Sequence, residues 1–531
     1  MDRRQFLAKL GASALALPAL LNAGKNKIEK EQKKNVVVIV SDDHAEKALG
    51  CYGSQEANTP NLDQMAQEGL KFTNAYCNAP ICSASRQSLL TGKYPHATGV
   101  TLLFTPFNDK KNYTIAEHLR NNDYKTGLIG KTHWNNWRWW KYYDEGGGFP
   151  DHGFDYIIGK GDYREKLKKN PPQKVPANIK TYQDQKNKKT TTAKWNAETL
   201  PTNKYYQDTE GAYFSEKAIE FMKENKDDNF FLWLAYHEPH APFTFPIEYR
   251  NKYDPADIDL PEGSPEDDRY IPEIFRGLTE SEKKGIIASY YSSSEFMDRN
   301  IGKVLQAIKD LNLAENTMVI YISDNGYMLY DHKRFEKHMM WEEAVKSPMI
   351  VKGYQKNKTT AALTEFIDIA PTICEAVGVD SPESFQGKSF LPVVKGRQKE
   401  YKDYVFAEYL EDNKAMLASK NWKYIFTTGK RDLGLQYATG YGPTGLEERL
   451  YNLKKDPDES HDVAQDDANQ KQLQFMRQKM LEIFIETHPD AENVPPKLNT
   501  IGKLIWFCEP RDVGDEPGQG LKRIFEAEDE K

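Results

Sequence analysis

The sequence predicts an α/β fold, with a large, mostly parallel central sheet sandwiched by helices and a smaller C-terminal antiparallel sheet with a helix. Three observations predict this arrangement. Residues 35–40 form a continuous, largely β-branched run (Asn-Val-Val-Val-Ile-Val), which is typical of a strand buried on both faces, as in a parallel sheet. Similar runs recur at 126–130, 230–235 and 318–322, with helical segments between them. From about residue 400 the pattern changes to short alternating strands.

The other elements are predicted from the periodicity of apolar residues and from turn residues. Helices are expected at 58–71, 113–121, 208–224, 288–311, 365–377 and 466–486. Further strands are expected at 348–352, 404–409 and 422–426. Residues 160–200 are rich in Lys, Asn and Thr, and we expect an irregular insertion there, either near the mouth of a site or as a surface loop.

The length of 531 residues indicates two domains, or one large domain with an appendage. We expect a linker at 24–34, a main domain at 35–398 and a C-terminal subdomain at 399–531. The formal net charge is −7, and the first 34 residues are basic, so the body of the chain is more acidic still. This charge argues against general nucleic-acid binding. Five cysteines do not make a disulfide scaffold.

Residues 1–23 have the features of an export signal. Arg3-Arg4 and the residues after them resemble a twin-arginine motif, and an apolar run of twelve residues ends at Leu21. That run is too short to span a bilayer, which takes about 20 residues. We therefore expect a bacterial protein of the periplasm or the medium, without stable membrane insertion. The alternative is an N-terminal amphipathic helix.

Two of the predicted strands end in similar polar sequences. The first ends in Asp42-Asp43 and the strand at 318–322 ends in Asp324-Asn325, each after a serine. Ligands of open α/β sheets bind at the carboxyl ends of strands, and carboxylates beside a buried strand are unfavourable unless paired or metal-bound. Side by side, the two ends would offer three carboxylates and an amide, which suits Ca²⁺ or Mg²⁺. Each one alone could be a solvated turn.

Polar residues also follow two other predicted strands. Lys131 and His133 come after 126–130, and His237 and His240 come after 230–235. A single histidine could be a core residue with its hydrogen bonds satisfied. Two histidines three positions apart, in a proline-stiffened loop at a strand end, favour a functional site.

Four tryptophans lie within seven positions, from Trp134 to Trp140, with Arg138 and Lys141 among or beside them. Such a cluster could be a platform that binds a charged sugar by stacking and cation–π contacts. It could equally be a packed aromatic loop. The sequence leaves both interpretations open.

The stretch that carries most information is 82–96, which begins Cys-Ser-Ala-Ser-Arg. If it opens a helix, Cys82 and Arg86 share a face near the positive end of the helix dipole. That position is expected to acidify the thiol and to hold a bound oxyanion. The alternative is a buried cysteine on an ordinary helix.

This stretch resembles the signature of the type I, formylglycine-dependent sulfatases of the alkaline phosphatase superfamily. The resemblance covers nearly the whole chain after the signal. The matching segments are Asp42-Asp43, Gly130-Lys131-Thr132-His133, Pro239-His240-Ala241-Pro242-Phe243, Ser323-Asp324-Asn325-Gly326, Lys337 ahead of Trp341-Glu342, and Leu450-Tyr451-Asn452-Leu453 with Asp456-Pro457. Ala84 stands where proline is commoner in the signature, so maturation is expected to depend on the host's maturase.

The resemblance implies an alkaline-phosphatase-like fold with 35–398 as the catalytic sulfatase domain. It implies that Cys82 is oxidised to formylglycine (3-oxoalanine), whose hydrate attacks sulfur. One Ca²⁺ per chain is implied, in contact with the modified Cys82. Its other implied ligands are Asp42, Asp43, Asp324 and Asn325.

The resemblance also implies roles for the matched cations and histidines. Arg86 would steady the hydrate, while Lys131 and Lys337 would bind the sulfate oxygens. His133 would take the proton that lets the covalent adduct collapse. His240, with Lys337, would protonate the leaving oxygen. Further residues expected near the substrate are Trp134, Arg138, His237 and His332.

The sequence therefore predicts an exported sulfatase that hydrolyses a sulfate ester on a sulfated polysaccharide or a derived oligosaccharide. Its expected partners are this saccharide and a formylglycine-generating maturase, and no signal indicates the oligomeric state. Two alternatives stay open. One is a phosphonate or phosphodiester hydrolase of the same superfamily, and the other is a carbohydrate-binding relative in which Cys82 is never matured.

Overall fold

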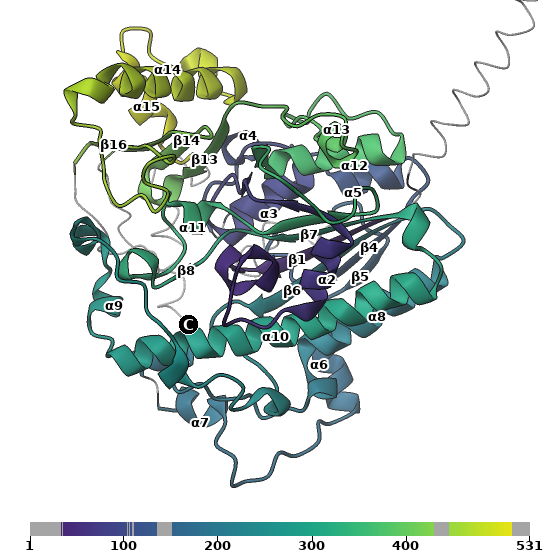
Figure 1. The fold of residues 1–531 in the computed structure, drawn as a ribbon. Helices are drawn as coiled ribbons and strands as arrows, with labels where there is room; N and C mark the ends of the chain where they lie inside the picture. The colour runs from purple at the N-terminus through teal and green to yellow at the C-terminus, as the bar shows by residue number, and fades with distance from the viewer. Residues whose placement is uncertain are drawn as a thin grey trace, which may run out of the picture.

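The computed structural model describes residues 33–511 except 34, 104, 106, 109–110, 135–150, 189 and 429–444. The predicted export signal at 1–23 therefore lies outside the described residues. Figure 1 shows a central twisted sheet between two layers of helices, with a smaller sheet and its own helices beside it.

The central sheet has eight strands. They are β1 (Asn35–Asp42), β2 (Gly69–Phe72), β4 (Lys125–Gly130), β5 (Tyr156–Ile158), β6 (Phe230–Pro239), β7 (Thr317–Ser323), β10 (Met349–Lys352) and β11 (Lys358–Thr360). Their order is β11-β2-β10-β7-β1-β6-β4-β5. All neighbours are parallel except that β10 runs antiparallel to β2 and β7. The predicted mostly parallel sheet and its four apolar strands are confirmed.

Side chains of β1 alternate between two hydrophobic cores, one on each face of the sheet. Val36, Val38 and Val40 belong to the first core, and Val37 and Ile39 belong to the second. All five are fully buried. A strand covered on both faces needs apolar residues throughout, which explains the continuous run in the sequence.

Three helices cover the face with the second core: α2 (Pro60–Gln67), α8 (Glu210–Glu224) and α10 (Glu280–Asp310). Helix α10 begins before the predicted residue 288, because Thr279 and Glu282 form a capping box at its N-terminus. The predicted helix at 58–71 is wrong at its end, where 69–72 forms β2. Gly69 allows this strand to lie close to β10, since a Cβ there would lie 2.7 Å from the Val351 carbonyl oxygen.

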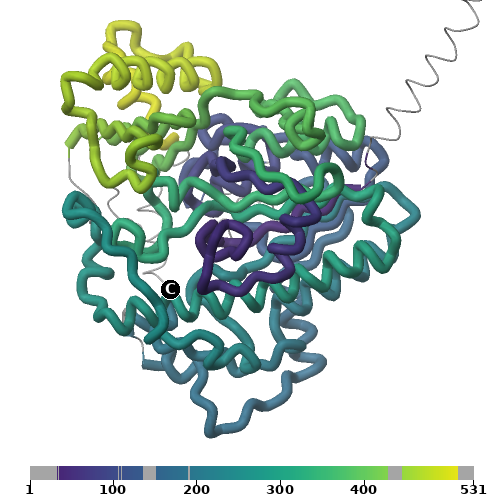
Figure 2. Tube along the Cα trace, in the orientation of Figure 1, coloured from purple at the N-terminus to yellow at the C-terminus, as the bar shows by residue number. Residues whose placement is uncertain are grey.

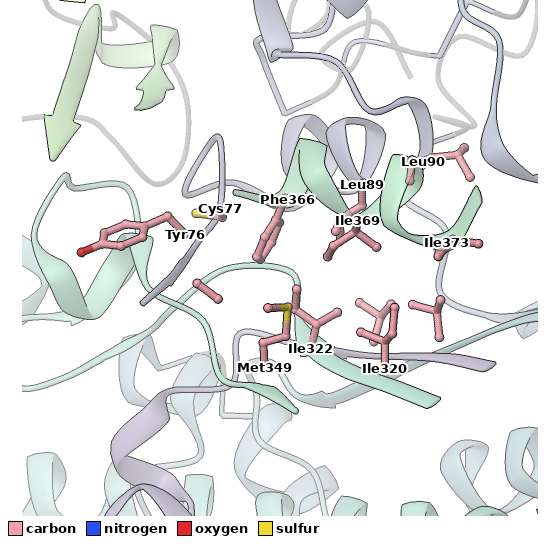
Figure 3. Close-up of a cluster of buried hydrophobic side chains, with 14 of the residues drawn as sticks. Tyr76, Cys77, Leu89, Leu90, Ile320, Ile322, Met349, Phe366, Ile369 and Ile373 are labelled. Atoms are coloured by element: carbon pink, nitrogen blue, oxygen red, sulfur yellow. The ribbon is translucent and has the colours of Figure 1, made fainter. Parts of the chain in front are cut away.

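The other face is covered by α3 (Cys82–Thr91), α5 (Ile115–Arg120), α12 (Ile369–Val377) and α13 (Leu391–Val394). Figure 3 shows Leu89 of α3 and Ile369 and Ile373 of α12 over Ile320 of β7. In the described ranges no helix is long and apolar enough to cross a membrane.

Short elements connect these layers. They are α4 (Pro95–Thr98), α6 (Lys160–Lys169), α7 (Tyr182–Lys186), α9 (Glu273–Arg276), α11 (Glu342–Val345), and the strand pairs β3 (Ala75–Tyr76) with β12 (Thr364–Glu365) and β8 (Met328–Leu329) with β9 (Phe335–Glu336). The segment 160–200 thus contains short helices rather than only irregular structure.

The C-terminal sheet is antiparallel, as predicted, with strands β13 (Val405–Tyr409), β14 (Lys414–Ala418), β15 (Lys423–Thr427) and β16 (Glu447–Tyr451). Helices α14 (Gln470–Thr487) and α15 (Thr500–Phe507) pack on one of its faces. Ala407, Met416 and Ile425 from its other face join the first core of the central sheet. Figure 2 shows this C-terminal part packed directly against the rest of the chain.

A buried ion network also joins the two sheets. Lys423 of β15 is fully buried and pairs with Glu342 of α11 at 2.9 Å and with Glu459 at 3.1 Å. Tyr76 of β3 donates to the same Glu342 at 2.8 Å. Breaking a buried pair of this kind typically costs about 3–5 kcal/mol, so the network fixes the C-terminal sheet to the central one.

Candidate active site

The carboxyl ends of β1, β4, β6 and β7 meet at one edge of the central sheet, because these strands are parallel neighbours. Asp42 at the end of β1 lies opposite Pro239 of β6. Gly130 at the end of β4 pairs with Ala235 of β6 and has a φ of 105°. A Cβ on Gly130 would lie 1.9 Å from the Ala235 carbonyl oxygen, so only glycine fits where the chain turns toward Lys131.

Cys82 is the first residue of α3, and Arg86 lies one turn later, as predicted. Every residue of α3 is buried, and the Ser85 hydroxyl donates to the backbone carbonyl of Asp324. Arg86 Nε donates to Asp324 Oδ2 at 2.7 Å, and its Nη2 lies 3.7 Å from Asp42 Oδ2. The helix is therefore fixed with its N-terminus against the ends of β1 and β7.

Three aspartates and an asparagine converge beside Cys82. Its Sγ lies 3.4 Å from Asp42 Oδ1 and 4.0 Å from Asp43 Oδ1. Asp324 accepts a hydrogen bond from the Asp43 N–H at 3.0 Å, and the Asn325 amide donates to Asp43 at 2.8 Å. All four side chains belong to buried residues. The two strand ends that the sequence singled out do lie together.

Two lysines add positive charge to this cluster. Lys131 pairs with Asp42, and Lys337 pairs with Asp43. Lys337 Nζ also lies 3.0 Å from Cys82 Sγ. Buried carboxylates need such partners, and the same ammonium groups could bind an anion next to the sulfur.

The oxygen-rich donor set fits a hard divalent cation. Ligand atoms of Asp42, Asp43, Asp324 and Cys82 lie within 4.8 Å of one another. Asn325 Oδ1 is buried and has no hydrogen-bond partner in the described part of the chain. An unpartnered buried carbonyl oxygen is unfavourable, and a cation at this position would satisfy it.

The expected acidification of Cys82 is wrong. Burial raises the pKa of the thiol well above its ordinary value, and Asp324 and Asp42 raise it further. Lys337 and Lys131 act in the opposite direction without offsetting this. An unmodified thiol here would stay protonated near neutral pH and would be a poor nucleophile.

Three of the predicted histidines border the cluster. Burial lowers the pKa of His133 well below its ordinary value, and its Nδ1 has no hydrogen-bond partner among the described residues. His240 places Nε2 3.6 Å from Asp43 Oδ2, and its Nδ1 lies 2.7 Å from the Ala241 carbonyl oxygen, to which it donates. The His237 ring lies 5.3 Å from the His240 ring, measured between centroids. These imidazoles are therefore placed to exchange protons beside the cluster.

The structure contradicts a saccharide platform at Trp134. The residue is fully buried in the first core, with its ring centroid 5.7 Å from that of Trp233 and stacked at 6.1 Å on Phe154. A ring enclosed by other rings has no face for a sugar, so Trp134 is a core residue. Arg138 and the other tryptophans of the cluster lie outside the described residues.

The structure also contradicts His332 as a substrate contact. Its Nδ1 lies 2.9 Å from Asp267 and its Nε2 lies 3.5 Å from Glu343. Its ring stacks on Trp341 at 4.0 Å. Both nitrogens are engaged in ion pairs, so His332 stabilises the segment that carries Lys337 rather than binding a ligand.

We expect His332→Gln to destabilise the protein more at pH 6 than at pH 10. Burial alone would lower the pKa of His332, but Asp267 and Glu343 outweigh it and raise the pKa to about 10. This stabilisation is fully present below the unfolded pKa of about 6.5 and is lost as pH rises through about 10. Denaturant unfolding at pH 6 is expected to show a loss of about 2–4 kcal/mol. Equal losses at both pH values would contradict this role.

Two further side chains hold the site together and were not predicted. Tyr290, in the middle of α10, donates to the Asp43 carbonyl and accepts from the Ala45 N–H at 2.7 Å. Nothing in the sequence distinguishes it from other buried helix residues. Ser85, by contrast, could have been found from its position between Cys82 and Arg86.

Comparison with known proteins gives this arrangement its class. A family model described as Sulfatase matches residues 34–379, and one described as N-sulphoglucosamine sulphohydrolase, C-terminal, matches residues 330–486. The match and the fold define a hydrolase of the alkaline phosphatase superfamily. The chain belongs to the sulfatase family, whose members are sulfuric ester hydrolases.

Individual relatives extend this comparison. The chain is similar to the N-acetylglucosamine-6-O-sulfatase of Bacteroides thetaiotaomicron, at 26% identity over 541 residues that cover 91% of this chain and 92% of that protein. It is also similar to an ulvan-active sulfatase of Formosa agariphila, at 29% identity over 408 residues. The match covers 73% of this chain and 71% of that protein. The solved phosphonate monoester hydrolase of Silicibacter pomeroyi has a TM-score of 0.70 at 21% identity, covering 87% and 97%. This last similarity confirms the predicted fold class.

Proposed function

We propose that the protein is an exported sulfatase that removes a sulfate ester from a sulfated carbohydrate, using a formylglycine made from Cys82 and a bound Ca²⁺. The observation that carries this proposal is the position of Cys82 Sγ, 3.0 Å from Lys337 Nζ and 3.4 Å from Asp42 Oδ1. The sulfur of Cys82 therefore lies next to both a cation that can hold a sulfate and a carboxylate that can hold a metal.

The chemistry of Cys82 supports its modification. A buried thiol with a raised pKa, next to Asp42 and Asp324, is a poor nucleophile as it stands. The aldehyde, once hydrated, supplies one hydroxyl for attack and a second for regeneration of the enzyme. The segment that begins at Cys82 resembles the family's modification signature.

Asp42, Asp43, Asp324 and Asn325 would hold the Ca²⁺, with the modified Cys82 beside it. Bound there, the ion would supply Lewis-acid polarisation of the sulfate oxygens. The unpartnered Oδ1 of Asn325 supports this assignment, because nothing else in the described residues uses that oxygen.

The remaining roles are those that the resemblance implies, and the positions of individual atoms support them. Lys131 and Lys337 would bind sulfate oxygens, and their ion pairs with Asp42 and Asp43 beside Cys82 support this role. His133 is neutral and its Nδ1 can accept a proton. His240 donates from Nδ1 to a carbonyl, so its imidazolium form would carry the second proton on Nε2 and could pass it to the leaving oxygen. Burial and Lys131 lower the pKa of His240, while Asp42 and Asp43 favour this protonated form. A general acid of this kind is worth about 10²–10⁴-fold in rate.

The substrate class is supported by the relatives, which include proteins named for N-acetylglucosamine-6-O-sulfate and ulvan chemistry. Export is proposed from the twin-arginine-like start and the short apolar run of residues 1–23. Oxidation of Cys82 requires a formylglycine-generating maturase as a partner.

A direct test is release of inorganic sulfate from a panel of sulfated oligosaccharides, beside phosphate release from matched phosphate esters and a phosphonate monoester. We expect sulfate release from at least one saccharide and much slower phosphate release. The expectation rests on the family to which the chain belongs, whose members are sulfuric ester hydrolases.

The reverse preference would establish the second candidate, a phosphonate hydrolase, which the structural similarity to such an enzyme keeps in view. Release of neither sulfate nor phosphate from any ester, together with an unmodified Cys82 peptide by mass spectrometry, would favour the third candidate. This candidate is a relative that only binds carbohydrate.

A further inference from the structure

We propose that the protein has a second oxyanion-binding site, formed where Arg334, Lys414 and Arg449 meet between the central sheet and the C-terminal sheet. Its ligand is a sulfate or carboxylate group, either as a second anionic substituent of the saccharide or as a free ion. Only the link to the saccharide rests on the proposed sulfatase function.

Arg449 is the strongest evidence for this site. It lies on β16 and is 2% exposed. Its Nη1 donates to the Tyr451 hydroxyl at 3.4 Å, but Nε and Nη2 have no hydrogen-bond partner in the described part of the chain. A buried guanidinium with two unpartnered nitrogens is unfavourable by several kcal/mol unless an anion compensates it.

Two carboxylates, Glu447 and Asp462, act electrostatically on Arg449 but bind other groups. Glu447 accepts hydrogen bonds from the Tyr270 hydroxyl and pairs with Arg269 at 3.0 Å. Asp462 accepts the backbone N–H groups of Leu450 and Ala464. In the described part of the chain, neither carboxylate forms a hydrogen bond or ion pair with the guanidinium of Arg449.

Two aromatic rings pack against the guanidinium of Arg449 but accept none of its hydrogen bonds. Its guanidinium carbon lies 4.7 Å from the centre of the Tyr270 ring and 5.4 Å from that of the Trp341 ring. Cation–π contacts use the faces of the guanidinium and leave its N–H edge for hydrogen bonds. The rings therefore hold the group in a fixed plane, which suits bidentate binding of an oxyanion.

Two more buried cations lie at the same place. Arg334 is fully buried and donates to the Tyr270 carbonyl at 3.0 Å, while Lys414 of β14 is 5% exposed and pairs with Asp412. Burial lowers the pKa of Lys414, and the charges of Arg449 and Arg334 lower it further against the effect of Asp412. Arg449 and Arg334 thus both act on Lys414, whose own ion pair is with Asp412.

The site adjoins the loop that carries the catalytic lysine. Arg334 precedes Lys337 by three positions, and Lys414 Nζ lies 3.7 Å from the sulfur of Met339, two positions after it. Glu342 of α11, which follows this loop, pairs with Lys423 of β15 in the C-terminal sheet. An anionic chain that presents one sulfate to Cys82 could therefore place another anionic group on the far side of the same loop.

Titration calorimetry of inorganic sulfate into the full chain in the presence of a chelator tests the site apart from the metal centre. We expect one bound sulfate that Arg449→Met abolishes and that Arg449→Lys weakens about tenfold, because lysine lacks the planar fork. Arg477→Met is the matched control, since Arg477 of the same subdomain is already paired with Glu448 at 2.6 and 2.8 Å. No binding in the wild-type protein, or equal binding in Arg449→Met, would overturn the proposal.

Thermal unfolding separates this role from a purely structural one. In sulfate-free buffer Arg449→Met is expected to unfold at or above the wild-type temperature, because it removes an uncompensated charge. Added sulfate should raise the unfolding temperature of the chelated wild-type protein but not that of Arg449→Met. A large drop in the variant at every sulfate concentration would mean that Arg449 only docks the two sheets.

Kinetics then distinguish the two sources of the ligand. If the saccharide supplies it, Arg449→Met should lower kcat/KM about tenfold or more for a substrate with a second anionic group and leave a singly sulfated one unchanged. If sulfate binds but neither substrate responds, the ligand is the free ion. Failure of every substrate to release sulfate would overturn the proposed function while leaving the calorimetric result to decide the site.

Discussion

Cys82→Ala is expected to reduce sulfate release by at least about 10⁴-fold while the protein stays folded. The variant lacks the thiol whose oxidation would make the proposed nucleophile, yet it loses only a small buried group. The four other proposed metal ligands are unchanged, so Ca²⁺ binding should persist in calorimetry. Sulfate release and thermal unfolding are the two measurements.

Cys77→Ala is the matched control for this experiment. Cys77 is also fully buried and lies nearby in the sequence, but it belongs to the first core, as Figure 3 shows. We expect this variant to keep its activity. Wild-type activity in Cys82→Ala, or the same loss in both variants, would show that Cys82 is not the nucleophile.

Asp324→Asn is expected to lower activity by about 10²–10⁴-fold and the free energy of unfolding by about 3–5 kcal/mol. Asparagine can still accept the hydrogen bond from the Asp43 N–H, but it cannot balance the buried charge of Arg86. It also removes one anionic ligand of the proposed Ca²⁺. kcat/KM should therefore recover in part at high Ca²⁺ concentration, whereas the unfolding loss in chelator should not.

Asp298→Asn provides the control for burial alone. Asp298 is 1% exposed and accepts from Asn61 and the Leu62 N–H, and burial raises its pKa to about 6. Among the described residues Asp298 pairs with no cation, so the amide should leave sulfate release unchanged. It should cost about 1–3 kcal/mol of stability, because both carboxylate oxygens accept from N–H groups and an amide has only one acceptor oxygen. If Asp298→Asn lost as much activity as Asp324→Asn, the effect of the latter would be on folding and not on the site.

The parts of the site predicted from the sequence are those that follow local rules. Asp42-Asp43 and Asp324-Asn325 come directly after apolar runs, and parallel strands bring such ends together. Cys82 and Arg86 are separated by one helical turn, so their common face was predicted as soon as the helix was. The mostly parallel sheet follows from the same apolar runs.

The parts that failed depend on residues far away in the chain. Trp134 is a core residue only because β6 brings Trp233 against it. The Cys82 thiol is not acidified, because Asp324 and burial outweigh the helix terminus that local reasoning considered. His332 pairs with Asp267, which lies in a different segment of the chain. The pattern of apolar and polar residues does not predict such a pair.

The network around Lys423 limits how the C-terminal sheet could be exchanged between related enzymes. Recombining such sheets is an obvious route to new specificity, since Arg449 and Lys414 both belong to this one. A graft that carried β15 without a matching Glu342 on the recipient would remove one of the two carboxylates that pair with the buried Lys423. Successful chimeras should therefore be those whose crossover keeps Glu342, Lys423 and Glu459 from one parent.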